Sequence, residues 1–215
     1  FIRTSDLGLN GKEMIDEQLK SSIGELPVTL DVNTVGSSVA ENTIRNSVIA
    51  VFIASLFVML YIVYAFRNVE QAYVYAIAAI ITLVHDVFVV MGLFILISIF
   101  VGSVVNSIFI VGILTVIGYS VNDTIVIFDR IRENLIVNKS TEFINVVNKS
   151  VGESVTRSLG TSITTSIVIL SMLLYGGQSL RDFLIVLLLG VIIGTYSSIF
   201  VASNLLLTWR YGIRK

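Results

Sequence analysis

The chain has 215 residues, of which 55% are hydrophobic and only 13% charged, and its mean hydropathy is +0.91. Soluble domains carry about 25% charged residues, so this composition excludes an ordinary soluble globule. The absence of cysteine excludes a disulfide scaffold and a thiol nucleophile. With 14 basic and 15 acidic residues, the chain lacks the concentrated basic face of a nucleic-acid binder. The composition indicates a lipid bilayer as the solvent.

Residues 1–45 are acidic and contain no long apolar run, so we expect them to lie in water. Asn10 and Glu13 fit a capping box that opens a short helix. After Pro27, apolar and polar residues alternate as in a half-buried strand. One helix and two strands make a poor core. We therefore expect a remnant of a small exterior α/β domain, in an N-terminally truncated chain.

Beyond residue 45 the chain predicts a bundle of membrane-spanning helices over residues 46–209. About 20 apolar residues cross the hydrocarbon core of a bilayer. Five stretches meet this requirement: residues 46–66, 72–98, 104–128, 154–175 and 183–208. Residues 129–153 form a polar cytoplasmic segment, in which the apolar positions of residues 129–150 predict a helix that lies against the membrane face. In the last span, Gly190 and Gly194 form a small-xxx-small pattern that predicts a close helix contact.

The distribution of basic residues predicts the orientation. With five spans, most of the Lys and Arg residues fall on one side, including residues 129–153 and the tail 210–215. The positive-inside rule makes this side cytoplasmic. We therefore expect a multi-pass protein of the cytoplasmic membrane, with its N-terminal piece outside and its C-terminus in the cytoplasm.

Ionisable residues within the predicted spans are the candidate functional residues. His85 and Asp86 lie in the second span, Asp123 in the third, and Arg157 near the start of the fourth. Leaving such a group in lipid costs about 2.5–3.5 kcal/mol. These side chains should therefore face a protein interior or a water-filled cavity.

Polar neighbours support a proton relay. The third span places Tyr119 and Ser120 on the helical face of Asp123, with Asn122 beside it. The fourth span places Thr161, Thr164 and Thr165 on the face of Arg157. A buried carboxylate near an arginine and a file of hydroxyls can gain and lose a proton.

Structural readings of the same residues remain open. Asp123 can pair with a neighbouring helix, Arg157 can snorkel to the surface, and the Ser/Thr run can permit close packing. For His85 and Asp86 a structural role is about as well supported as a functional one, because adjacent helical residues point about 100° apart and cannot act as one site.

No enzyme signature is present. The chain has no Gly-rich phosphate loop, no HExxH motif and no credible Ser/His/Asp set. A single histidine excludes a multi-histidine metal site. We expect no enzyme activity, no cofactor and no metal.

One segment resembles a known family. Residues 118–134 read Gly-Tyr-Ser-Val-Asn-Asp-Thr-Ile-Val-Ile-Phe-Asp-Arg-Ile-Arg-Glu-Asn, which resembles the signature of the SecF family of protein-export membrane proteins. Pieces of residues 154–202 agree: Thr-Arg-Ser, Thr-Ser-Ile-Thr-Thr, Tyr-Gly-Gly and Gly-Thr-Tyr-Ser-Ser-Ile-Phe. His85 and Asp86 resemble the family's histidine–aspartate pair. Asn204 departs from the family, which commonly has a proline there.

The resemblance implies an RND-type bundle with six spans, of which five are present here and the first is missing. It implies SecD as a partner, separate or fused, together with the SecYEG channel, and also YajC, an insertase and the translocating polypeptide. It further implies that Asp123 and Arg157 belong to a proton relay whose second aspartate lies in SecD. The expected function is the use of the proton motive force in late steps of polypeptide translocation.

Two other functions remain as alternatives. The chain can be a structural scaffold of the export machinery that conducts no protons, or an RND exporter of lipids or small molecules. The long match around Asp123 argues against the second alternative.

Overall fold

The computed structural model describes residues 14, 17, 18, 21, 37–67, 69, 71–101, 107–138, 140–177 and 180–212. The chain divides into two compact units, Phe1–Asn42 and Thr43–Lys215. The capping box and the strands expected within residues 1–45 lie outside the described residues. The stretches that are long and apolar enough to cross a membrane all belong to the second unit.

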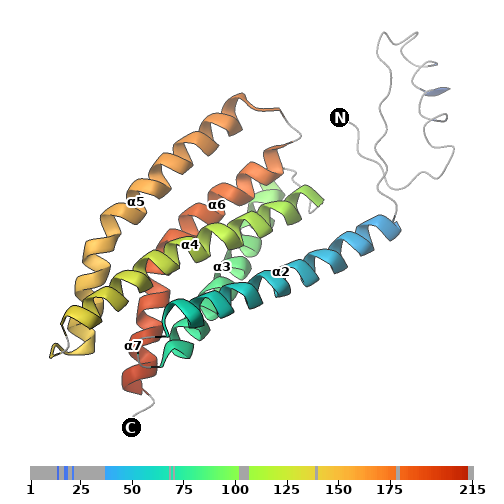
Figure 1. The fold of residues 1–215 in the computed structure, drawn as a ribbon. Helices are drawn as coiled ribbons and strands as arrows, with labels where there is room; N and C mark the ends of the chain where they lie inside the picture. Colours follow the sequence, from blue (N-terminus) through green and yellow to red (C-terminus); the bar gives the residue numbers. More distant parts are fainter. Residues whose placement is uncertain are drawn as a thin grey trace. The chain divides into compact units, whose positions relative to one another are not determined.

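Five long helical stretches meet this condition. The first four are α2 (Ser37–Ala65), α3 (Ala72–Val101), α4 (Ser107–Val137) and α5 (Phe143–Tyr175) (Figure 1). The fifth is continuous and consists of α6 (Arg181–Ser197), the π-helix η2 (Ser198–Ala202) and α7 (Ser203–Gly212). No strand occurs among the residues that the structure describes. The predicted, mainly α, five-span fold is confirmed.

The polar segment between the third and fourth spans forms no separate helix. Its residues extend α4 to Val137 and begin α5 at Phe143. Side chains between the two helices hold these ends together. Asn134 Nδ2 donates to Ser150 Oγ at 2.9 Å, and Arg130 Nε donates to Glu153 Oε2 at 2.7 Å. The expectation of a helix lying against the membrane face is therefore wrong, because these contacts make the segment a continuation of the α4–α5 hairpin.

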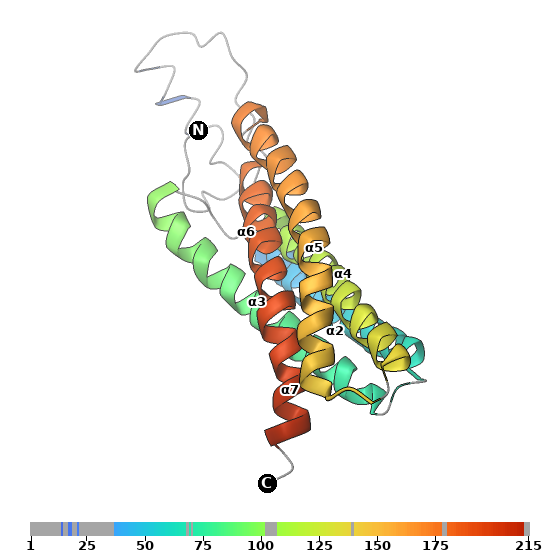
Figure 2. The same ribbon diagram turned by 90° about the vertical axis from the view of Figure 1, so that its left-hand side faces the viewer.

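α6 is the central helix of the bundle and packs against α3, α4 and α5 (Figure 2). Its glycines let α4 come close. A Cβ atom on Gly190 would lie 2.8 Å from Val116 Cβ, and one on Gly194 would lie 3.1 Å from Ser120 Cβ. Since no larger residue fits at Gly190 without a shift, the predicted close helix contact is confirmed.

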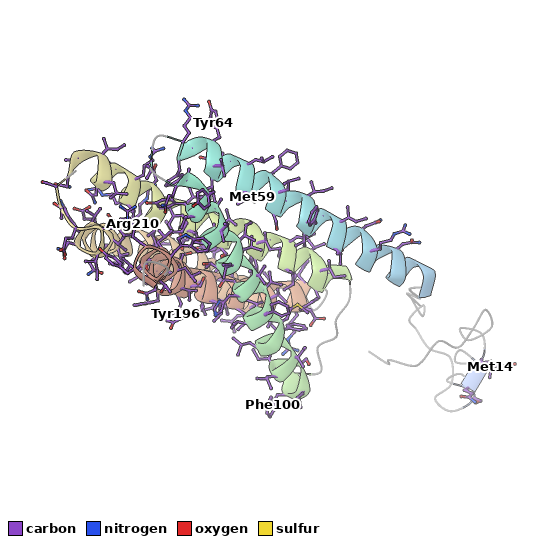
Figure 3. The ribbon with its side chains drawn as sticks, turned by 90° about the horizontal axis from the view of Figure 1, so that it is seen from below. Met14, Met59, Tyr64, Phe100, Tyr196 and Arg210 are labelled. Carbon is purple, nitrogen blue, oxygen red and sulfur yellow. The ribbon has the colours of Figure 1, made fainter. Side chains whose placement is uncertain are left out.

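α2 joins the bundle at its C-terminal end. Its described side chains before Ile62 are at least partly exposed, whereas Ile62 and Phe66 are buried. The Phe66 ring stacks on Tyr75, with 5.0 Å between the ring centroids. Arg132 Nη1 donates to the Ala65 carbonyl oxygen at 2.8 Å. Tyr64, by contrast, points away from the other helices (Figure 3). The end of α2 is thus an anchor between α3 and α4.

The π-helix interrupts the last span next to its buried serines. Short π segments occur mostly as bulges within α-helices. Asn204 follows η2, and its Nδ2 donates to the Phe200 carbonyl oxygen at 2.6 Å. The residue that departs from the family pattern therefore bonds to the backbone of the π-helix and does not touch the buried carboxylates.

The substitution Gly190→Ala tests the α4–α6 contact. Forcing a Cβ against Val116 should lower the free energy of unfolding by about 1–3 kcal/mol, measured as a loss of thermal stability in detergent. Gly118→Ala on α4 is the control, because a Cβ there meets nothing within 4 Å. Equal stability of the two variants would contradict the close crossing.

The substitution Arg132→Gln tests the anchor of α2. Loss of the bond to Ala65 should speed hydrogen–deuterium exchange of the backbone amides at the C-terminal end of α2 and leave exchange in α6 unchanged. Arg67→Gln is the control. Arg67 follows the end of α2, and its guanidinium lies over the ring of Tyr64 in α2, 4.5 Å from the ring centroid. Unchanged exchange in Arg132→Gln would show that packing alone holds α2.

Candidate functional site

The four ionisable candidates lie near the middle of their helices. His85 and Asp86 occupy the middle of α3, and Asp123 the middle of α4. Arg157 also lies near the middle of its helix, because α5 begins at Phe143, before the predicted span 154–175. All four groups are therefore more than two helical turns from the nearest end of their helices.

Asp86 is the best-enclosed carboxylate, with only 1% of its surface exposed. Ser120 of α4 donates a short hydrogen bond to Asp86 Oδ2, and Ser197 of α6 donates to the same oxygen at 2.7 Å. The other oxygen, Oδ1, lies 3.0 Å from His85 Nδ1. The expectation that His85 and Asp86 cannot act as one site is therefore wrong, because the imidazole of the preceding residue reaches the carboxylate.

Asp123 is buried between α4 and α6, with 4% of its surface exposed. Thr195 Oγ1 of α6 donates to Asp123 Oδ2 at 3.2 Å. Thr195 also forms a short hydroxyl contact with Ser162 of α5, and Ser162 Oγ lies 3.0 Å from the Tyr119 hydroxyl. A chain of three hydroxyls thus runs from Asp123 across three helices and returns to α4.

A third polar contact joins α4 to the last span. Thr124 Oγ1 of α4 and Ser198 Oγ of η2 are 2.8 Å apart. Ser198 also donates to the Ser120 carbonyl oxygen at 3.4 Å. Ser120 itself bonds to Asp86 and lies one turn before Asp123 on α4. Asp86 and Asp123 therefore share one polar layer at the α4–α6 contact.

α5 separates its serines from its threonines. The buried serines recur at every fourth position and face the bundle; they are Ser150, Ser154, Ser158 and Ser162. Thr161 and Thr164 are exposed, and their hydroxyls bond to backbone carbonyls of α5 itself. Thr165 is half-buried. The Ser/Thr run thus both permits close packing and leaves polar groups on the outer face.

Arg157 lies on this exposed face of α5. Within the described part of the chain no ion pair joins Arg157 to Asp123, so the structure does not bring the two predicted relay residues together. Asn122 is likewise exposed, whereas Tyr119 and Ser120 contact the buried layer. The Ser158 hydroxyl is buried and has no hydrogen-bond partner among the described residues.

Sequence reasoning missed the polar residues of the last span. Thr195, Ser197 and Ser198 supply the hydroxyls that reach Asp123, Asp86 and Thr124. A signal was available, because these residues follow Gly194 within an otherwise apolar helix. Among the described residues no group of three or more His, Asp and Glu side chains is placed to hold a metal ion.

Comparison with known proteins identifies the family. The model of the family described as "Protein export membrane protein SecD/SecF, C-terminal" matches residues 16–212. The chain belongs to the SecD/SecF family. A protein translocase subunit SecF from Thermobaculum terrenum is 40% identical over 198 residues, which are 92% of this chain and 62% of that protein.

Two further comparisons agree. A protein translocase subunit SecF from a Synechocystis strain is 38% identical over 210 residues, which are 97% of this chain and 65% of that protein. The crystal structure of SecDF from Thermus thermophilus, described as a translocon-associated membrane protein, superposes with a TM-score of 0.79 at 31% identity. The superposed region covers 97% of this chain and 27% of the SecDF chain. The chain is thus a multi-pass membrane protein that spans less than two thirds of the length of these SecF relatives.

The substitution Thr195→Val tests the bond to Asp123. It preserves the shape of the side chain but removes the donor, so the protein should lose about 1–3 kcal/mol of stability, measured by thermal denaturation in detergent. Thr195→Ser retains the hydroxyl and should recover most of the loss. If both variants lose the same stability, the methyl group and not the hydroxyl is what matters.

Proposed function

We propose that this chain is a subunit of the Sec protein-export machinery that uses the proton motive force to promote late steps of polypeptide translocation. The observation that carries the proposal is Asp123, an aspartate buried in the middle of α4 and bonded to a hydroxyl of a second helix. Ionisable groups at this depth mark proton and ion pathways. Membership of the SecD/SecF family supplies the export context.

The hydroxyl of Thr195 can couple the protonation of Asp123 to the packing of three helices. This hydroxyl has one hydrogen and three neighbours: Asp123 Oδ2, Ser162 Oγ and the Val191 carbonyl oxygen at 2.8 Å. An ionised Asp123 attracts the hydrogen. A protonated Asp123 can itself donate to Thr195, which frees the Thr195 hydrogen for Val191 or Ser162. Each proton that binds or leaves thus rearranges the bonds between α4, α5 and α6.

Arg157 belongs to the proposed relay through its position on the exposed face of α5. Together with Thr161 and Thr164 it exposes polar groups near the middle of the helix. A charged group left in lipid within a span costs about 2.5–3.5 kcal/mol, so we propose that a protein surface covers the face. The family resemblance makes SecD the partner, with a second relay aspartate on its side. Arg157 would then stabilise an ionised carboxylate at this interface.

The available energy is sufficient for a conformational bias. One elementary charge that crosses 100 mV releases about 2.3 kcal/mol, and about 1.4 kcal/mol changes a population ratio tenfold. A proton passing through Asp123 can therefore shift the bundle between two arrangements. Rocking of one half of the transporter against the other would transmit this shift to the exterior.

The proposal includes the surroundings of the chain. SecD, separate or fused, would be its direct partner, and the SecYEG channel, YajC and an insertase the wider assembly. Residues 1–45 would lie outside the cytoplasmic membrane, while the α4–α5 hairpin and the C-terminal tail would lie on the cytoplasmic side. The cluster of basic residues at the hairpin supports this orientation.

One observation favours the alternative of a scaffold without proton conduction. Asp86 and Asp123 both accept hydrogen bonds from neighbouring helices, and polar groups of this kind also hold membrane helices together. In a scaffold, the amide of an asparagine would replace either carboxylate with little loss of function.

The decisive experiment is the gradient-dependent completion of translocation in vesicles that contain the full Sec assembly. Asp123→Asn should lose the gradient-dependent acceleration, a loss of about tenfold or more by the energy above, while the ATP-driven rate and the binding of partners remain. Survival of the gradient response at equal assembly would establish the scaffold.

Arg157→Gln is the second variant for the same assay. Because Arg157 makes no side-chain bond within the described bundle, its loss should leave the stability of the purified chain unchanged but lower the gradient response. Arg181→Gln is the matched control, since Arg181 is an exposed arginine at the start of α6. Equal responses of the two arginine variants would remove Arg157 from the relay.

A further inference from the structure

Asp86 is a second buried carboxylate that the relay proposed for Asp123 does not use. Two serine hydroxyls from two different helices donate to its Oδ2. Its one ion-pair partner in the described part of the chain is His85. Asp86 thus meets a titratable partner at Oδ1 and fixed neutral donors at Oδ2.

The geometry suits transfer of a proton between the two side chains. In the tautomer with a hydrogen on Nδ1, His85 donates to Asp86 Oδ1 across 3.0 Å. A proton that binds at Nε2 creates an imidazolium, which can pass its Nδ1 proton to Oδ1. The imidazole is then neutral again as the Nε2–H tautomer, and Asp86 is a neutral acid. The serine donors can stay in place throughout, because both donate to the other carboxylate oxygen.

His85 connects this carboxylate with the outside of the bundle. Its side chain is 39% exposed, whereas that of Asp86 is 1% exposed. No hydrogen bond within the described residues engages Nε2. Imidazole is the side chain that most readily accepts and releases protons near neutral pH. The pair therefore joins a partly exposed imidazole to a carboxylate enclosed in the bundle. Because lipid supplies no protons, the exposed side of the imidazole needs water or a polar partner surface beside it.

No charged side chain from the helices packed against α3 bonds to His85 or Asp86 among the described residues. On α4 Tyr119 adjoins Ser120 and its hydroxyl contacts Ser162, while the nearest carboxylate, Asp123, bonds to Thr195 and not to Asp86. On α6 the charged residues Arg181 and Asp182 lie at the start of the helix, and Arg210 lies near the end of α7. η2 carries no charged residue. Both carboxylates accept a hydrogen bond from α6, and Asp86 accepts a second one from α4.

We propose that His85 and Asp86 form a second proton-binding site, in which His85 exchanges protons with water at a partner interface on the surface of the bundle and Asp86 holds the proton inside. The site rests on the proposed proton-driven function, since its protonation changes hydrogen bonds on the same helices that respond to Asp123. It differs from a structural anchor, which would need the hydrogen bonds but not the exchange of a proton.

Infrared difference spectra between two pH values test proton uptake directly, on the purified chain in lipid. We expect a protonated-carboxyl band that disappears in Asp86→Asn and persists in Asp123→Asn. Imidazole bands assigned by their loss in His85→Gln should appear in the same difference spectrum, since the chain has a single histidine. A wild-type spectrum without an Asp86-dependent band would overturn the proposal.

The gradient-dependent export assay with the full assembly tests the function. Asp86→Asn and His85→Gln should each lose the gradient response. Asp182→Asn, which changes a carboxylate in the first turn of α6, should retain it. If both variants retain the response while Asp123→Asn loses it, the second site is wrong and the relay at Asp123 stands. If Asp123→Asn also retains it, the proposed function itself fails.

His85→Gln is a second test of the site in case the Asp86→Asn variant does not fold. It leaves Asp86 and its bonds from Ser120 and Ser197 in place. Should Asp86→Asn fail to assemble, a normal response in an assembled His85→Gln variant would overturn the proposal, and a lost response would support it.

Discussion

α6 approaches α4 so closely that a single methyl group on Gly190 would collide with Val116. The polar interior depends on this approach. Thr195 of α6 reaches the carboxylate of Asp123 on α4 beside the close approach of Gly194 to Ser120. Ser120 in turn donates to Asp86 of α3, which also accepts from Ser197 of α6. In a membrane, where lipid is as apolar as leucine, close packing and interhelical hydrogen bonds replace the hydrophobic effect as the source of helix association.

The buried layer combines rigidity with the capacity to change. Every carboxylate in it accepts hydrogen bonds from hydroxyl groups, and a hydroxyl can reverse the direction of its bond when its partner gains a proton. Thr195 has alternative acceptors on α5 and on its own backbone. The same contacts that hold α4, α5 and α6 together are therefore the ones that a proton would rearrange. The π-helix begins within this layer, at Ser198, where the backbone of the last span departs from regular α geometry.

α5 shows how one helix can serve two environments. Serines at every fourth position pack against the bundle, and Arg157 with its threonine neighbours remains on the exposed face. Helical periodicity makes this division, because residues 157 and 158 differ by about 100° around the axis. A small hydroxyl permits close packing on the inner face, while the outer face keeps polar groups that a partner surface can match.

Some properties followed from the sequence because they depend on local composition. Long apolar runs predicted the five spans, and the Gly190–Gly194 spacing predicted the close contact of the last span. Burial of Asp123 was also predictable, since an isolated carboxylate in an apolar helix must avoid lipid. The separate helix expected over residues 129–150 was not found, because these residues continue α4 to Val137 and α5 from Phe143. Hydrogen bonds between side chains of the two helices hold these ends together.

The sequence by itself determined the membrane-spanning class, the family and the span that carries each ionisable group. Only the tertiary structure decided which groups meet. It placed His85 against Asp86, Thr195 against Asp123, and Arg157 on the outside. The physical reason is that helical spacing specifies the face of a residue, whereas the opposing helix, its rotation and its distance are set by packing between segments far apart in the chain.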